Sequence, residues 1–159
     1  MKYFTTSPKD HPKVTYLHFA NSPTLLIGVF CFPQSAVIPL HDHPGMTEPL
    51  IIVICLVLPP YDWVMASSAS NQLNTDAIFD ATSKIVVLYP EDGETCTVQR
   101  VSPCAVLDVM GPPYCLEEGR DCFYFSSEVA GGDGQYAWLN KVPCTIEMDA
   151  DRIRAKIRR

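Results

Sequence analysis

Short apolar stretches and turn residues alternate along most of the chain. The apolar stretches are rich in β-branched and aromatic residues, and proline, glycine, asparagine and aspartate separate them. Successive side chains on a strand point to opposite faces, so this pattern predicts many short strands and no long helix. It is typical of a β-sandwich or β-barrel. We expect strands at residues 15–19, 24–32, 36–43, 50–58, 62–67, 85–89, 95–101, 104–110 and 122–126, with a loop at 71–80.

The two ends of the chain differ from this pattern. Residues 1–13 are polar and broken by proline, which predicts a flexible arm before a single domain at 14–147. In the basic tail, 148–159, Ile153 and Ile157 lie four residues apart among arginines and a lysine. This spacing predicts a short amphipathic helix. We expect it to be a solvated terminal helix, with binding to acidic partners as the alternative.

Composition narrows the class of protein. A length of 159 residues, with 47% hydrophobic and 19% charged residues, is typical of one globular domain. The net charge of −6 argues against general binding to nucleic acid or to anionic membranes. The apolar run at 50–58 is too short to span a membrane and is better explained as a buried strand.

Cysteine usage predicts a reduced protein. The seven cysteines are odd in number and contain no C-x-x-C pair. The first residues lack an apolar signal core, so we expect an intracellular location. Most of the cysteines are then expected to be small buried apolar residues.

A pair of histidines is the strongest chemical signal. His41 and His43 end the strand expected at 36–43, just before a Pro-Gly turn. Because residues i and i+2 of a strand share a face, both imidazoles would point to one metal. Only four histidines occur, so any histidine-rich metal site must contain this pair. His18 stands alone on another expected strand, where we expect a structural role.

The residues around this pair resemble a known family. The segment 30–47 resembles the signature of the plant cysteine oxidases, which belong with the 2-aminoethanethiol dioxygenases among the cupin-fold thiol dioxygenases. The resemblance implies an all-β, single-domain cupin-type double-stranded β-helix (a jelly-roll barrel) with short terminal extensions. Further similar blocks lie at 61–63, 87–90, 102–114, 119–124 and 136–139.

The resemblance also implies an activity. Members of this family are non-haem Fe(II) enzymes, and the plant members use O₂ to oxidise the N-terminal cysteine of regulatory proteins to cysteine sulfinic acid. That oxidation feeds an N-degron pathway that senses oxygen. For this chain it implies Fe(II) as cofactor, O₂ and an N-terminal-cysteine protein or peptide as partners, and a cytoplasmic or nuclear location. We expect a monomer that binds neither nucleic acid nor membrane.

Several site residues follow from the same resemblance. His41 and His43 match two of the family's three iron ligands. Asp108 and Tyr114 match residues near the iron and the substrate entrance. In a working site we expect Asp108 to pair with the substrate's α-ammonium or to hold a water-linked network, and Tyr114 to hydrogen-bond O₂ or the sulfinate; the alternatives are a structural aspartate and a packing tyrosine. Cys122 and Tyr124 match a cysteine–tyrosine pair that can cross-link in the animal relatives, although we expect an uncross-linked pair here.

The family's third histidine ligand is missing. Cys96 occupies its place, eight residues before Cys104, and could bind as a thiolate. Glu94 is a more distant possibility. Glu48 follows His43 by five residues, the spacing of a cupin motif in which a glutamate completes a 2-His-1-carboxylate triad. The remaining alternative is a site with no third protein ligand.

The missing ligand leaves two other functions open. One is a catalytically inactive relative that binds N-terminal-cysteine peptides or another protein. The other is a cupin that uses His41, His43 and Glu48 to bind Mn or Fe and acts on a different small substrate.

Overall fold

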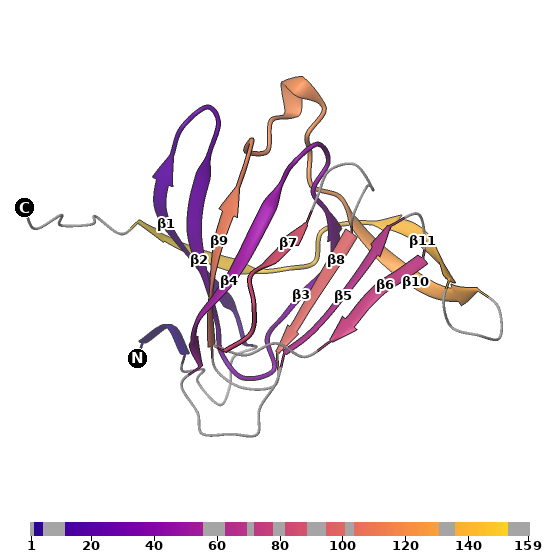
Figure 1. Cartoon of the computed structure of the whole chain (residues 1–159), viewed down its shortest axis with the longest axis horizontal. Coiled ribbons are helices and arrows are strands. Elements are labelled where there is room, and N and C mark those ends of the chain that lie inside the picture. Colours follow the sequence, from indigo (N-terminus) through magenta and orange to yellow (C-terminus); the bar gives the residue numbers. More distant parts are fainter. Residues whose placement is uncertain are drawn as a thin grey trace, which may run out of the picture.

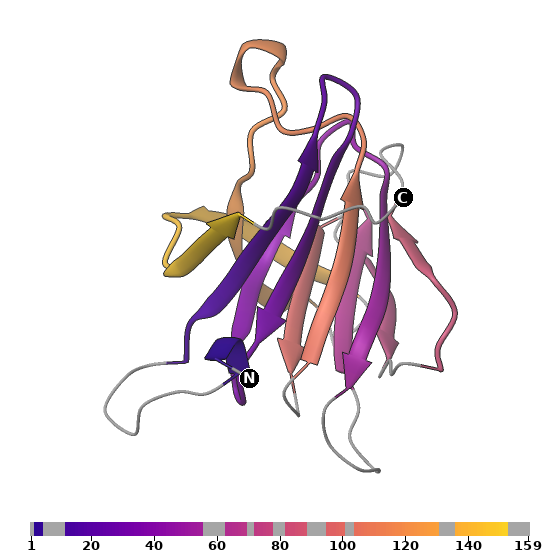
Figure 2. The same cartoon turned by 90° about the vertical axis from the view of Figure 1, so that its left-hand side faces the viewer.

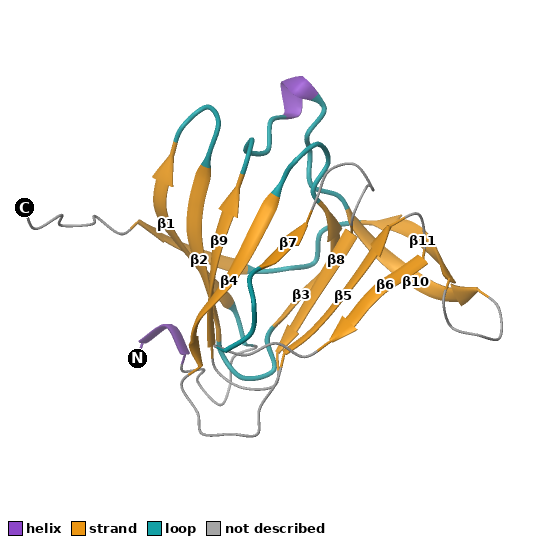
Figure 3. Ribbon diagram, viewed as in Figure 1, coloured by secondary structure: helices purple, strands orange, loops and turns teal. Residues whose placement is uncertain are grey.

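The computed structural model describes residues 2–4, 12–55, 63–69, 72–77, 82–88, 95–100, 104–130 and 136–152. Within these ranges only the backbone is described for residues 2, 48–55, 63–69, 72–77, 95–100, 129–130 and 136. The described chain is all-β, with two short 3₁₀ helices, η1 (Lys2–Phe4) and η3 (Leu116–Glu118) (Figure 3). The strands are β1 (Val14–Asn21), β2 (Leu26–Phe32), β3 (Val37–Asp42), β4 (Glu48–Cys55), β5 (Trp63–Ala69), β6 (Gln72–Ala77), β7 (Val86–Leu88), β8 (Thr95–Arg100), β9 (Cys104–Met110), β10 (Tyr124–Ala130), β11 (Tyr136–Val142) and β12 (Met148–Arg152).

The strands form two sheets that stand as two layers (Figures 1 and 2). One sheet has the order β12-β1-β2-β9-β4-β7. The other, β10-β11-β6-β5-β8-β3, closes on itself through the pairing of β10 with β3. The chain crosses from the first sheet at β2 to the second at β3 and returns at β4. The consecutive strands β2, β3 and β4 therefore alternate between the two layers, as in a jelly roll.

The alternation of side chains explains the core. On β9, Cys104 and Val106 are buried in a cluster with Phe32 and Ile38, and Ile38 comes from the other sheet. The intervening Ala105 is buried on the opposite face. Burial of one large apolar side chain contributes about 1.5–3 kcal/mol to the free energy of unfolding. A register shift of one residue would move these side chains to the other face, so the alternation fixes the register of the strands.

The N-terminal residues are partly attached to the domain. Tyr3 and Phe4 of η1 pack against the cluster of Leu17, Cys31 and Ala105. This part of the expected arm therefore covers the outer face of the six-stranded sheet, and residues 5–11 lie outside the described chain. No helix of the described residues is long and apolar enough to cross a membrane.

Two predicted elements are wrong. Residues 148–152 were expected to begin a helix, but they form β12, which pairs in parallel with β1 from Val14 to His18. All five β12 residues are exposed, so backbone pairing to the edge of β1, and not burial, explains this strand. Residues 72–77, expected in a loop, form β6 between β5 and β11. Ile153 and Ile157 lie outside the described residues.

Candidate metal centre

The two histidines of the motif are buried side by side. His41 lies near the end of β3 and His43 directly after it, with 9% and 5% of their surfaces exposed. The ring centroids are 4.6 Å apart. Two imidazoles this close, in a buried setting, are a suitable donor pair for one metal ion.

A backbone hydrogen bond orients His41 for metal binding. Its Nδ1 lies 2.8 Å from the carbonyl oxygen of Pro39. A carbonyl can only accept, so Nδ1 carries the proton and donates. The lone pair of the neutral ring is therefore on Nε2, the arrangement that metal-binding histidines use.

The turn after β3 ties the pair to the other sheet. The Met46 amide donates to the His43 carbonyl at 3.1 Å, and Met46 is fully buried. Gly45 has φ of +65°, a left-handed conformation that favours glycine. Thr47 then exchanges two backbone hydrogen bonds with Gly111, at 2.8 and 3.0 Å. These contacts fix the backbone on both sides of His43.

Two tyrosines pack against the histidine rings. Tyr124 on β10 is paired in register with His41, and their rings stack with centroids 5.8 Å apart. The Tyr114 ring lies 6.0 Å from that of His43. The Tyr114 hydroxyl donates to the Asp42 carbonyl at 3.0 Å. Tyr114 thus holds the end of β3 in addition to flanking the metal pair.

Cys122 completes this cluster. Burial raises the pKa of its thiol, and hydrogen bonds with Tyr114 and Tyr124 partly oppose that shift. Burial, and then the charge of Cys122, raise the pKa of the Tyr124 phenol. Both groups are therefore protonated at neutral pH. The structure brings together His41, His43, Tyr114, Cys122 and Tyr124.

Asp42, between the two histidines, has a different role. Its Oδ1 accepts a hydrogen bond of 2.7 Å from the Phe123 amide, and its own amide donates to the Phe123 carbonyl at 3.1 Å. Burial raises the pKa of this carboxyl, although the Phe123 hydrogen bond opposes the shift. Asp42 thus anchors the chain just before β10 against the end of β3.

The candidates for a third ligand are placed by their backbones only. Cys96 on β8 is directly opposite His41 in register, in the same sheet. Glu48 begins β4 in the six-stranded sheet and is opposite Leu88. Glu94 lies outside the described residues. Because the side chain of none of the three candidates is described, the ligand role of all three stays a prediction. Among the side chains that the structure describes, no group of three or more His, Cys, Asp or Glu residues is placed to hold a metal.

Asp108 lies on the facing sheet. It is completely buried on β9, in register with Gly28 on β2 and Leu50 on β4. The Tyr16 ring fills the space above Gly28, because a Cβ added there would lie 2.4 Å from the Tyr16 hydroxyl oxygen. Burial, and then the charge of Asp108, raise the pKa of Tyr16 to about 12.

Tyr16 is a site residue that sequence reasoning missed. The sequence signals for Tyr16 were weak. Tyr16 alternates with His18 along one strand, and Gly28 interrupts an otherwise apolar strand. In the structure the ring centroids of Tyr16 and His18 are 6.2 Å apart. Neither pattern shows that the charge of Asp108 acts on Tyr16, because β2 separates their two strands.

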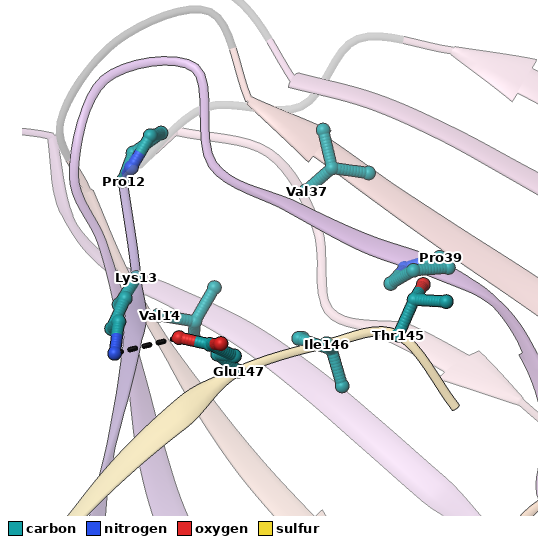
Figure 4. Close-up of a pocket in the computed structure, with 8 residues that line it drawn as sticks. All are labelled: Pro12, Lys13, Val14, Val37, Pro39, Thr145, Ile146 and Glu147. Carbon is teal, nitrogen blue, oxygen red and sulfur yellow. Dashed lines mark ion pairs between the residues drawn. The ribbon is translucent and has the colours of Figure 1, made fainter. Parts of the chain in front are cut away.

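A groove of about 290 Å³ lies away from these residues (Figure 4). Proline, valine and isoleucine side chains line much of it, and Lys13 and Glu147 form an ion pair of 2.7 Å at one side. Its lining includes Pro39, whose carbonyl orients His41, and among the described side chains it includes neither His41 nor His43.

Comparison with known proteins identifies relatives of the whole described domain. The family model PCO_ADO matches residues 2–151. Plant cysteine oxidase 1 of Arabidopsis thaliana is 42% identical over 125 residues, which are 74% of this chain and 43% of that protein. The 2-aminoethanethiol dioxygenase of Mus musculus is 29% identical over 143 residues, 74% of this chain and 56% of that protein. The chain spans about half the length of the curated relatives it matches.

Solved structures support the predicted fold. KdgF from Halomonas sp. superposes with a TM-score of 0.52 at 12% identity, covering 72% of this chain and 96% of that one. A double-stranded β-helix protein from Klebsiella pneumoniae gives 0.50 at 13% identity, covering 76% and 89%. The all-β cupin-type double-stranded β-helix is therefore confirmed. By the match over residues 2–151, the chain belongs to PCO_ADO, the family of the plant cysteine oxidases and the 2-aminoethanethiol dioxygenases.

Proposed function

We propose that this chain is a thiol dioxygenase domain that binds Fe(II) through His41 and His43. Its proposed reaction is the oxidation of the N-terminal cysteine of a protein or peptide to cysteine sulfinic acid by O₂. The observation that carries the proposal is the buried histidine pair, with Nε2 of His41 left available by the Pro39 carbonyl. Membership of the family supports the same chemistry.

The donor set fits a borderline metal ion such as Fe(II). Neutral imidazoles suit iron, and a third donor at the register position of Cys96 or from Glu48 would complete a facial triad. Bound iron would supply a Lewis acid for the substrate thiolate and the redox chemistry for O₂. The product lies two steps up the oxidation ladder from the thiol, with both oxygen atoms on sulfur.

The chain's own residues position the reactants. Tyr124 stacks on His41, and Tyr114 flanks His43 while its hydroxyl donates to Asp42. These contacts restrict ring rotation and keep water from the buried imidazoles. In this structure the Tyr114 hydroxyl donates its hydrogen bond to the Asp42 carbonyl. A role of Tyr114 as donor to O₂ or to the sulfinate therefore stays a prediction.

Asp108 supplies the group that would recognise an N-terminal residue. A fully buried aspartate is suited to pairing with an α-ammonium, because in a site of low dielectric the attraction between opposite charges is strong. The same pairing would lower the high cost of keeping the carboxylate charged. We further propose that the protein acts as a monomer in the cytoplasm or nucleus, on the oxygen-sensing N-degron route.

The test uses anaerobically iron-loaded protein and a peptide that begins with cysteine. Exposure to O₂ should increase the peptide mass by about 32 Da, two oxygen atoms, and a matched peptide beginning with serine should not change. His41→Ala should abolish both iron binding and the mass gain. His18→Ala is the matched control, because His18 lies on β1 outside the pair. Full activity in His41→Ala would disprove the proposal.

A binding function without catalysis is the second candidate. It is favoured by the cysteine that occupies the backbone position opposite His41. Such a protein would bind the cysteine peptide with little iron after loading under argon. The third candidate, a metal site completed by Glu48, predicts that Glu48→Gln abolishes metal binding whereas Cys96→Ser does not.

A further inference from the structure

Two cysteines lie just beyond the end of the β10–β11 pair. The antiparallel register joins Phe125 to Lys141 and Tyr124 to Val142, the last pair. In such a pair, each step toward the N-terminus of one strand matches one step toward the C-terminus of the other. Cys122 precedes Tyr124 by two residues and Cys144 follows Val142 by two, so the same register, if extended, would place the two cysteines opposite each other.

Side-chain contacts support this juxtaposition. Burial, and then interactions with the Cys122 and Cys144 thiols, raise the pKa of the Tyr124 phenol. Both sulfurs therefore lie near the same hydroxyl. Cys122 is half-buried, Cys144 is exposed, and both are free thiols.

The expected backbone separation suits a disulfide. Residues directly opposite each other in an antiparallel pair have Cα atoms about 4.5–5.5 Å apart. Disulfides form at Cα separations of roughly 4.4–6.8 Å. Closing the bond therefore needs side-chain rotation about Cα–Cβ and little movement of the strands.

We propose that Cys122 and Cys144 form a redox-active pair, which a hydroperoxide oxidises to a disulfide beside the metal centre. The exposed Cys144 thiolate attacks one oxygen of the hydroperoxide, and Cys144 becomes a sulfenic acid. With hydrogen peroxide the O–O bond breaks, and the hydroxide that leaves takes up one proton and becomes water. The Cys122 sulfur then attacks the sulfenic sulfur. The S–S bond forms, the S–O bond breaks and a second water leaves. Two thiols thus supply the two electrons that reduce one hydroperoxide.

The disulfide competes with another fate of Cys122. One sulfur cannot be bonded both to Cys144 and, as a thioether, to the Tyr124 ring. Tyr124 stacks on His41, so whichever of the two bonds forms lies next to the His41–His43 pair. The disulfide itself is independent of the proposed function, whereas an effect on thiol oxidation rests on it.

Tryptic mapping separates the two bonds. Cleavage at Arg120, Lys141 and Arg152 places Cys122 in fragment 121–141 and Cys144 in fragment 142–152. After metal-free protein is treated with hydrogen peroxide and its remaining thiols are blocked, the disulfide joins the two fragments until a reductant is added. A thioether stays inside fragment 121–141, with a loss of about 2 Da that persists after reduction.

Two variants provide the controls. Cys144→Ser should remove the joined fragments, and because Cys144 is exposed the protein should still fold. Cys115→Ser, at a half-buried thiol elsewhere, should leave them in place. The proposal is overturned if fragment 142–152 joins a different cysteine, or if Cys144 gains oxygen while Cys122 remains a free thiol. Iron-loaded, reduced protein that oxidises no thiol would contradict the proposed function alone, since the mapping uses metal-free protein.

Discussion

Replacement of Gly28 by alanine tests how Tyr16 is held beside Asp108. The added Cβ would lie 2.2 Å from Tyr16 Cε2 and 2.4 Å from its hydroxyl oxygen, whereas ordinary contacts begin at 3.4 Å. The Tyr16 ring must therefore move by about 1 Å or more. It also packs on Phe30, with ring centroids 4.9 Å apart, so the movement disturbs a second contact.

Two opposing effects set the magnitude. Overpacking of this kind costs roughly 1–3 kcal/mol of unfolding free energy. Where alanine fits without strain, it stabilises by about 0.4–1 kcal/mol, because it restricts the unfolded chain. Gly28 has no left-handed φ, so the second effect applies here. We expect Gly28→Ala to destabilise the protein by about 1–2 kcal/mol.

A double-mutant cycle isolates the contact. In a Tyr16→Ala background the collision is absent, and Gly28→Ala should be neutral or stabilising. In a Tyr16→Phe background the ring carbons remain, and the cost should persist. Urea unfolding of metal-free protein measures all five variants and the wild type. Additivity of Gly28→Ala and Tyr16→Ala to within about 0.5 kcal/mol would refute the reasoning.

Three further predictions concern the metal pair, alkaline stability and the edge of the sheet. Cys96→His should tighten Fe(II) binding by at least about tenfold in anaerobic titration, because it adds an imidazole opposite His41. The control Thr95→His should not tighten binding, and equal effects of the two substitutions would contradict the register. Because the pKa of Tyr16 is raised from 10.0 to about 12, the stability this residue contributes is complete below pH 10 and lost as the pH rises through 12. The urea midpoint should therefore fall more steeply over that range in wild type than in Tyr16→Phe, and parallel slopes would contradict the shift. Removal of residues 148–159 should lower the unfolding free energy and promote self-association in light scattering, because it exposes the edge of β1; an unchanged midpoint would show that the pairing contributes nothing.

Strands with one face in the core were predicted well. The bounds of β9 match the sequence pattern, because Cys104 and Val106 face the core between the sheets while Ala105 faces outward. A period of two is visible in the sequence wherever burial alternates in this way. The predicted bounds of β1, β2 and β3 also lie within two residues of the observed ones.

Strands that depend on backbone pairing were missed. Met148–Arg152 has five exposed side chains, so its sequence carries no strand pattern. The nearby isoleucine spacing favoured a helix, but the edge of β1 offers hydrogen-bonding groups that a strand can satisfy. Such pairing overrides local preference, and only the arrangement of the whole sheet reveals it.

Site residues were predictable within one strand and much less so between strands. His41 and His43 were found because their spacing alone places them on one face. Tyr16 and Cys144 were missed, because their electrostatic interactions with Asp108 and Cys122 depend on which strands are neighbours. A motif search examines separation along the chain, whereas these pairs are defined by register.

The register of β3 with β8 decides which residue can complete the metal site. Val37 and Ile38 pair with Gln99 and Val98, and this register, continued without change, would place Thr95 opposite His41. An irregularity between Ile38 and His41 shifts the pairing by one residue, so that Cys96 takes this position. A shift of one residue reverses the face on which a side chain lies. The irregularity in β3 would therefore belong to the proposed metal centre, since it places Cys96, the residue predicted to stand at the third-ligand position, opposite His41.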